Sequence, residues 1–182
     1  MNSLQSDPRF YLLRDAMFGD WNTAEVLIAQ DPTIIEARSS TGETALHYVA
    51  IEDHLEGVKW LLERGANVNT RDNFQSTPLI GAAQLGHEQM CRLLLDHGAD
   101  LFAMDNIERT ALSTTLDSEP VNRALLYLFL AHKGDSDINL LFGDLDADRL
   151  LFNKGPRIAE FWLNLGLQPR FESDEDEEAE PQ

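Results

Sequence analysis

The residues of this chain that could carry covalent or metal chemistry are one cysteine, five histidines and a lysine in the run FNKGPR. A cysteine near histidines could act as a thiol nucleophile with a base, and the same residue types bind metal ions. The run around Lys154 lacks the glycine spacing and the Ser or Thr of a P-loop, and no GxSxG nucleophile elbow occurs. Whether the cysteine and the histidines do chemistry therefore depends on the elements that position them.

Two successive blocks of the sequence, 41–73 and 74–106, superimpose at an offset of 33 residues without a gap. A fixed period of this length indicates a stack of structural repeats. A third copy begins at Thr110 and Leu112. The matched positions are Thr44, Leu46, Ala50, His54, Leu61, Leu62, Gly65 and Ala66, which recur as Thr77, Leu79, Ala83, His87, Leu94, Leu95, Gly98 and Ala99.

Each repeat reads as turn, helix, turn, helix. Thr77 is an N-cap whose hydroxyl can accept a backbone N–H, and Pro78 follows where a missing N–H costs nothing, so a first helix begins near 77. Gly86 ends that helix after about two turns. Residues 89–95 have apolar residues at helical spacing, and Gly98 is suited to cap the second helix.

The runs TALH and TPLI, EDH and LGH, and WLLERGANVN and LLLDHGADLF resemble the TPLH box, the GH turn and the second helix of the ankyrin-repeat family. The resemblance implies an all-α fold, a solenoid of stacked helix pairs joined by hairpin loops. The sequence departs from the family pattern at several places. Gln75 and Glu108 replace the hairpin glycine, Asp53 replaces the glycine of the GH turn, and Ile80 and Ser113 replace the box histidine. We expect less regular hairpins as a result.

The register predicts one ankyrin-repeat domain over 1–170, with capping units at its two ends. A glycine displaced to Gly134 predicts a three-residue insertion near 118–120, between the helices of the fourth unit. The predicted units are approximately 8–38, 39–71, 72–104, 105–139 and 140–169.

This register gives the histidines and the cysteine structural roles. Cys91 corresponds to Val58 one repeat earlier, which marks it as a small core residue. His47, His54 and His87 lie at positions where an imidazole ties loop backbone groups together, and His97 and His132 lie close to glycines that end helices. We therefore predict no catalytic, cofactor or metal site, with metal binding as the alternative. Trp21, Trp60 and Trp162 fall on second helices and are interpreted as packing residues.

The formal net charge is −18, and seven carboxylates lie in the tail 171–182, so subtracting the tail leaves −11 on the remainder. An acidic surface repels phosphate backbones, which argues against nucleic-acid binding and favours a basic protein partner. The alternative is that the charge serves solubility. From Glu172 onward the tail has no large apolar residue to offset its ordering entropy, and we expect it to be disordered.

The composition is 43% apolar and 25% charged, and no apolar run approaches the roughly 18 residues of a membrane span. The start of the chain has no charged-then-apolar leader. A single cysteine cannot form an intramolecular disulfide. These features predict a soluble, cytoplasmic protein that does not bind membranes.

The resemblance also implies where a partner binds, because ankyrin-repeat proteins commonly grip partners with their hairpin fingers and the exposed side of their first helices. Large apolar side chains at such positions are typical of interface cores. Single exposed apolar residues are also ordinary on monomers, which is the alternative interpretation. The predicted partner-binding residues are Met17, Phe18, Ser40, Thr41, Glu43, Ile51, Glu52, Asn73, Phe74, Ser76, Gln84, Leu85, Asn106, Ile107, Arg109, Asp117 and Ser118.

The sequence thus favours a non-enzymatic protein-binding module that is monomeric when free and binds a basic protein. An inhibitor or an immunity-type protein is one concrete form of this function. Two alternatives remain open: an enzyme or its regulatory subunit, and a scaffold that self-associates through its apolar residues. The fold alone does not choose among partners.

Overall fold

The computed structural model describes residues 6–117 and 122–132. The chain divides into two units, Met1–Asp144 and Leu145–Gln182, and all of the described residues belong to the first. The predicted insertion near 118–120, the fifth unit at 140–169 and the tail 171–182 lie outside the described residues. The units predicted at 8–38, 39–71 and 72–104 lie within them, as does most of the unit predicted at 105–139.

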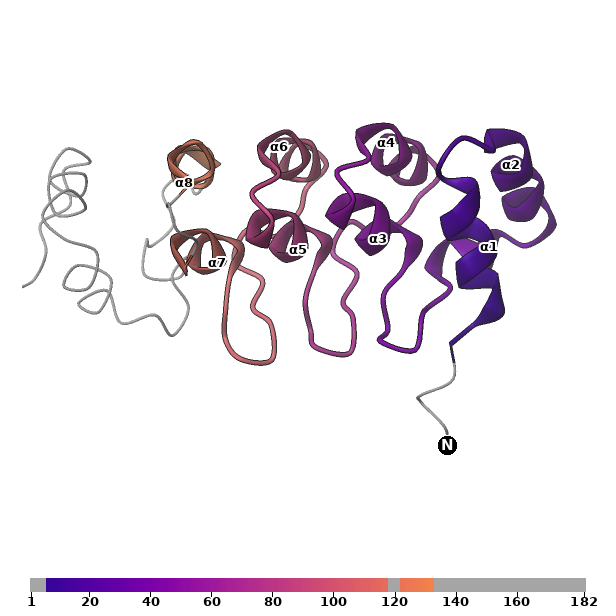
Figure 1. Ribbon diagram of the computed structural model, residues 1–182, viewed down its shortest axis with the longest axis horizontal. Coiled ribbons are helices and arrows are strands. Elements are labelled where there is room, and N and C mark those ends of the chain that lie inside the picture. The colour runs from indigo at the N-terminus through magenta and orange to yellow at the C-terminus, as the bar shows by residue number, and fades with distance from the viewer. Residues whose placement is uncertain (1–5, 118–121, 133–182) are drawn as a thin grey trace, which may run out of the picture. The chain divides into compact units, whose positions relative to one another are not determined.

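All regular elements of the described residues are helices, which confirms the predicted all-α class. Figure 1 shows the helix pairs in a row and in two layers. We call α1, α3, α5 and α7 the inner helices, and α2, α4, α6 and α8 the outer helices. The elements are α1 (Pro8–Ala16), α2 (Trp21–Gln30), the 3₁₀ helix η1 (Pro32–Glu36), α3 (Ala45–Ile51), α4 (Leu55–Glu63), α5 (Pro78–Gln84), α6 (Glu88–Asp96), α7 (Ala111–Asp117) and α8 (Arg123–His132).

Several helices begin at side chains that satisfy the free N–H groups of the first turn, whereas α6 begins at His87 without a side-chain cap. The hydroxyl of Thr77 accepts the N–H of Ile80 at 3.3 Å ahead of α5, as the sequence predicted. An imidazole takes the same role at α4, where Nδ1 of His54 accepts the N–H of Gly57 at 2.9 Å. The repeated histidine is thus part of the turn between the two helices.

The core lies between the two helix layers and between neighbouring repeats. The inner helices pack in sequence, α3 on α5 and α5 on α7. Leu46, Leu79 and Leu112, one repeat apart from each other, are all buried. Cys91 and Leu94 on α6 have no exposed area, which confirms that they are core residues.

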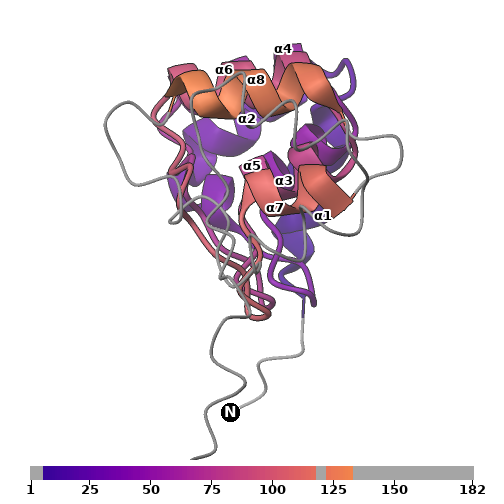
Figure 2. The same cartoon turned by 90° about the vertical axis from the view of Figure 1, so that its left-hand side faces the viewer.

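Hairpin loops project from the inner layer, and we call residues 39–43, 72–76 and 105–109 the first, second and third fingers. Figure 2 shows that the loops project in the same direction. The prediction of less regular fingers was wrong. Gly42, Gln75 and Glu108 share a left-handed backbone, with φ of 83°, 62° and 63°. Each donates its N–H to the carbonyl three residues earlier, at 3.0, 3.1 and 3.1 Å.

Carboxylates hold the second and third fingers in this strained shape. Oδ1 of Asp72 accepts the N–H groups of Phe74 and Ser76, both at 2.8 Å. Oδ1 of Asp105 accepts those of Ile107 and Arg109 at 3.0 and 2.9 Å. These side-chain bonds stabilise a turn that would otherwise favour glycine.

Candidate protein-interaction surface

The predicted site residues fall into two groups, at opposite ends of the first helices. Each inner helix begins beside a finger and ends at the turn that leads to its outer helix. α5 has seven residues. Because an α-helix rises 1.5 Å per residue, its two ends, and with them the two groups, lie about 10 Å apart. We call the first group the finger row: Asn73, Phe74, Ser76, Asn106, Ile107 and Arg109. We call the second group the turn ridge: Phe18, Ile51, Glu52, Gln84, Leu85 and Asp117.

Two large apolar side chains stand out from the finger row. Phe74 is 54% exposed and Ile107 is 62% exposed. Their fingers are joined directly, because the N–H of Asn106 donates to the carbonyl of Phe74 at 2.8 Å. Phe74 and Ile107 therefore lie on adjacent fingers with fixed backbones.

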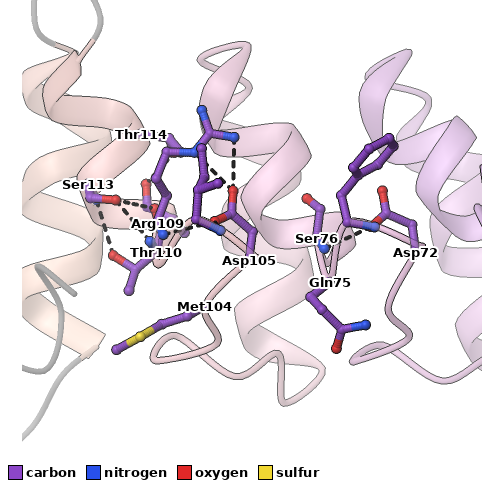
Figure 3. Close-up of polar contacts among 12 residues, drawn as sticks. Asp72, Gln75, Ser76, Met104, Asp105, Arg109, Thr110, Ser113 and Thr114 are labelled. Carbon is purple, nitrogen blue, oxygen red and sulfur yellow. Dashed lines mark hydrogen bonds and ion pairs between the residues drawn. The ribbon is translucent and has the colours of Figure 1, made fainter. Parts of the chain in front are cut away.

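Arg109 supports the third finger. Its Nε donates to Oδ2 of Asp105 at 2.9 Å, and its Nη2 lies 2.9 Å from the same oxygen (Figure 3). The Asp105 side chain is 2% exposed, so its charge is compensated by Arg109 and by backbone N–H groups. Arg109 is thus committed to the finger and presents only part of its guanidinium to a partner.

Asn73 and Ser76 also hold finger geometry. Nδ2 of Asn73 donates to the carbonyl of Ser40 in the first finger at 3.0 Å. The carbonyl of Ser76 lies 3.1 Å from Nε2 of His47. Because Nδ1 of His47 accepts the N–H of Thr44 at 3.1 Å, Nε2 carries the proton and donates to Ser76. The buried histidine links the start of α3 to the next finger.

The turn ridge carries exposed apolar and acidic side chains. Leu85 and Phe18 are 54% and 49% exposed, and Glu52 and Gln84 are also exposed. Ile51 is only half-buried, and it packs beside Gly81 of α5, where an added Cβ would lie 3.2 Å from Cγ1 of Ile51.

Met17, Asp117 and Ser118 were also predicted in this region. Met17 was predicted to be exposed, but the structure shows it to be fully buried, because its side chain enters the core at the end of α1. Asp117 ends α7, and its side chain lies outside the described residues, as does Ser118.

The sequence prediction missed the two aspartates that shape the fingers. Asp72 and Asp105 lie one repeat apart, as do the residues they organise. Ser39 takes the same place in the first finger, where its Oγ accepts the N–H groups of Thr41 and Glu43 at 3.2 and 3.1 Å. The recurrence of a short oxygen-bearing side chain at a spacing of 33 residues was the available signal.

The structure gives the cysteine and the histidines structural roles. Burial raises the pKa of the Cys91 thiol to about 12, which leaves it protonated and unreactive at neutral pH. Nε2 of His87 lies 2.8 Å from the carbonyl of Ile51, and Nδ1 of His97 lies 2.8 Å from that of Leu93. Over 6–117 and 122–132, no three His, Cys, Asp or Glu residues are grouped to hold a metal ion.

Residues 12–105 match the family model for ankyrin repeats, in three copies. The match covers just over half of the chain. The chain belongs to the ankyrin-repeat family. The helix pairs and fingers are therefore ankyrin repeats, and ankyrin repeats mediate interactions between proteins. Within the part of the chain that the structure describes, no helix of this ankyrin-repeat protein has the length and apolarity to cross a membrane.

Curated relatives share the repeats over a small part of their own length. Human (Homo sapiens) inversin is 35% identical over 117 residues, which is 64% of this chain and 11% of inversin. Serine/threonine-protein kinase VIK of Arabidopsis thaliana is 39% identical over 37% of this chain and 16% of the kinase. Mouse (Mus musculus) protein phosphatase 1 regulatory subunit 12A is 34% identical over 40% of this chain and 7% of that protein. The chain thus spans a sixth or less of these relatives.

Proposed function

We propose that this ankyrin-repeat chain is a non-enzymatic module that binds a basic protein across its finger row and the first helices. The observation that carries the proposal is the pair formed by Phe74 and Ile107, more than half exposed on adjacent fingers whose backbones are hydrogen-bonded to each other. A lone monomer gains nothing from this arrangement. A partner would cover both side chains at once.

The pair suits an interface energetically. Burial of a Phe or Ile side chain contributes about 1.5–3 kcal/mol, so the two together would supply a substantial share of the binding free energy. The fingers are already ordered by Asp72 and Asp105, so little entropy is lost when the partner binds. The apolar pair therefore forms the anchor of the proposed interface.

The charge of the chain supports a basic partner. The formal net charge is −18, and Glu52 is an exposed carboxylate of the turn ridge. Complementary charge mainly accelerates association and disfavours wrong partners, whereas the apolar anchor slows dissociation. An inhibitor or immunity-type protein that covers a basic active site is the concrete form we propose, acting as a cytoplasmic monomer.

A regulatory subunit is the second candidate. The observation that favours it is the similarity to mouse protein phosphatase 1 regulatory subunit 12A, whose name states a regulatory role. Both candidates use the same surface to hold a protein. An inhibitor would abolish the activity of the bound protein, whereas a regulatory subunit would adjust it.

The test is a comparison of proteins retained by immobilised chains and identified by mass spectrometry. The double variant F74S/I107S removes the apolar anchor, and Val26→Ser is the matched control, because Val26 is 52% exposed on α2. We expect one basic protein to be retained by the wild type and by V26S and lost by the double variant. Loss with V26S alone would place the interface on the outer helices and overturn the proposal.

Surface plasmon resonance with the identified partner then separates the two contributions. Phe74→Ala should raise the off-rate about tenfold or more, because it truncates an anchor residue. Glu52→Lys should chiefly slow association and weaken its dependence on salt. Unchanged kinetics for both variants would contradict the assigned surface.

A further inference from the structure

The segments after the first two outer helices carry side chains that tie one unit to the next. We count the units by their helix pairs, from α1 and α2 in the first unit to α7 and α8 in the fourth. Oε1 of Glu36 accepts the N–H of Asn67 at 2.9 Å, which ties the first unit to the second. One repeat later, Oδ1 of Asn69 accepts the N–H of Asp100 at 2.7 Å, and its Nδ2 donates to the carbonyl of Gly98 at 3.1 Å. The same kind of tie thus spans the first two joints of the stack.

An arginine two residues further along makes a second tie at each of these joints. Nη1 of Arg38 donates to the carbonyl of Gly42 at 2.8 Å and to that of Arg71 at 2.6 Å. Nη1 of Arg71 does the same one repeat later, with the carbonyl of Gln75 at 3.2 Å and that of Met104 at 2.7 Å. Each arginine therefore holds the next finger and the matching position of the next unit at once.

Both ties end at the third unit. The residues at the matching positions are Phe102 and Met104, one repeat after Asn69 and Arg71. Phe102 has no polar side-chain atom, and the side chain of Met104 (Figure 3) has no N–H to donate. The third unit therefore lacks the two ties that the first and second units make to the unit after them.

Helix packing and a turn still connect the third unit to the fourth. α7 packs on α5, and α8 packs on α6. In the turn, Nδ2 of Asn122 donates to the carbonyl of Gly86 at 3.3 Å. One unit earlier, Nε2 of His87 lies 2.8 Å from the carbonyl of Ile51. The turn link of the last joint is thus the longer and weaker of the two.

α7 also carries buried hydroxyl groups that bond within their own unit. Ser113 is buried at the position where α5 has Ile80, and its Oγ donates to the carbonyl of Thr110 at 3.0 Å (Figure 3). Oγ1 of Thr114 donates to the carbonyl of Ala111 at 2.9 Å. These bonds satisfy the hydroxyl groups without adding a link to the third unit, and such bonds slightly destabilise a helix.

We propose that the stack opens first at the joint between the third and fourth units, with α7 and α8 unfolding locally while the first three units stay folded. A stack of repeats is held together by contacts between neighbours, so it opens where those contacts are weakest. α7 has seven residues and α8 has ten, and helices of this length are marginal in water without packing. Undocking of the fourth unit therefore exposes its backbone N–H groups to solvent.

The joint between the third and fourth units runs between the two residues of the apolar pair. Phe74 lies on the finger before α5, and Ile107 lies on the finger before α7. A partner that covers both side chains would bind the closed joint in preference to the open one and would thereby order the fourth unit. This consequence rests on the proposed function, whereas the opening itself does not.

The test is native-state hydrogen exchange of the full chain without a partner, followed by NMR. Four backbone amides at one place in the inner helices, 33 residues apart, report on the four units: Ala16, Val49, Ala82 and Thr115. We expect the protection factor of Thr115 to be at least about tenfold below those of the other three. Equal protection at Thr115 and Ala82 would overturn the proposal. Equally low protection at Ala16 and Thr115 would also overturn it, because both ends of the stack would then merely fray.

A double variant moves the weak joint by one unit. Asn69→Phe together with Arg71→Met gives the joint between the second and third units the residues of the last joint. The protection factor of Ala82 should fall about tenfold or more, and that of Val49 should stay unchanged, because the lost hydrogen bonds tie the third unit to the second. Arg71→Met alone is the milder variant and should act in the same direction. Unchanged protection of Ala82 in both variants would show that the ties do not decide where the stack opens.

Arg92→Met is the matched control for the loss of an arginine. Arg92 is exposed on α6 and lies 3.6 Å from a carboxylate oxygen of Glu88 on the same helix, so its loss should leave all four amides unchanged. A fall in the protection of Ala82 in R92M equal to that in R71M would trace the effect to charge rather than to the tie, and would overturn the proposal. The exchange experiment uses no partner and leaves Phe74 and Ile107 in place, so its failure would not bear on the proposed function.

Discussion

Asn73 joins the second finger to the first by two hydrogen bonds. Its backbone N–H donates to the carbonyl of Thr41 at 2.9 Å, and its Nδ2 donates to the carbonyl of Ser40 at 3.0 Å. The amide thereby fills the space beside Gly42, where an added Cβ would lie 2.7 Å from the backbone nitrogen of Asn73. Gly42 is required here by both its conformation and its neighbour.

Gly42→Ala should destabilise the chain by about 2–3 kcal/mol, because the left-handed backbone costs about 1–2 kcal/mol for a side chain and the contact with Asn73 adds to it. The measurement is urea unfolding followed by circular dichroism. Gly65→Ala is the matched control, because Gly65 has φ 88° and nothing within 4 Å of the added Cβ. Equal losses for the two variants would show that the fingers move apart without cost.

Leu94→Ala should cost about 2–5 kcal/mol of unfolding free energy, because Leu94 has no exposed area and its truncation leaves a cavity between repeats. Leu85→Ala removes the same atoms from a side chain that is 54% exposed and should cost less than about 0.5 kcal/mol. Chemical denaturation of both variants tests the contrast. Similar losses at the two positions would contradict the core assigned to α6.

His47 should make stability depend on pH. Burial lowers the pKa of the His47 imidazole, despite the opposing hydrogen bond to Ser76 and the nearby Asp72. In the unfolded chain the same group titrates near 6.5, so on acidification the unfolded state takes up the proton first. Stability is therefore complete above pH 6.5 and is lost as the pH falls from there toward the lower pKa of the folded state.

The check compares unfolding free energies of the wild type and His47→Asn between pH 7.5 and 5. Asparagine is uncharged over this range and can accept the N–H of Thr44 from the same position. The wild type should lose stability relative to the variant on acidification, at up to about 1.4 kcal/mol per pH unit. Parallel pH profiles would show that the pKa of His47 is the same in the folded and unfolded states.

The sequence predicts the helices and the core of this protein well, because both follow from the 33-residue register. The positions of Cys91 and Leu94 could be read directly from Val58 and Leu61 one repeat earlier, and all four residues are buried. Met17 was misplaced because the first repeat matches the register only loosely. Its burial depends on how α1 ends, which the pattern of the later repeats does not contain.

The candidate site was less predictable for two physical reasons. The register gives the position of a residue within a repeat, and it grouped Phe74 and Leu85 in one predicted surface. In the structure α5 separates them, because Phe74 lies before the start of this helix and Leu85 follows its end. Glycine preference also suggested irregular fingers at Gln75 and Glu108. The carboxylates of Asp72 and Asp105 accept hydrogen bonds from the backbone N–H groups on either side of these two residues, and these bonds outweigh the local preference of a single residue.

Gln75 and Glu108 hold a left-handed backbone that glycine adopts without strain, with φ of 62° and 63°. Replacing either residue by glycine should stabilise the chain by about 0.5–1 kcal/mol, since relief of strain exceeds the added entropy of the unfolded glycine. Thr41→Gly is the control on an exposed finger residue without positive φ, and it should destabilise. The comparison uses thermal unfolding of the three variants under identical conditions. Destabilisation by Gln75→Gly and Glu108→Gly would show that these two side chains make contacts worth more than the strain.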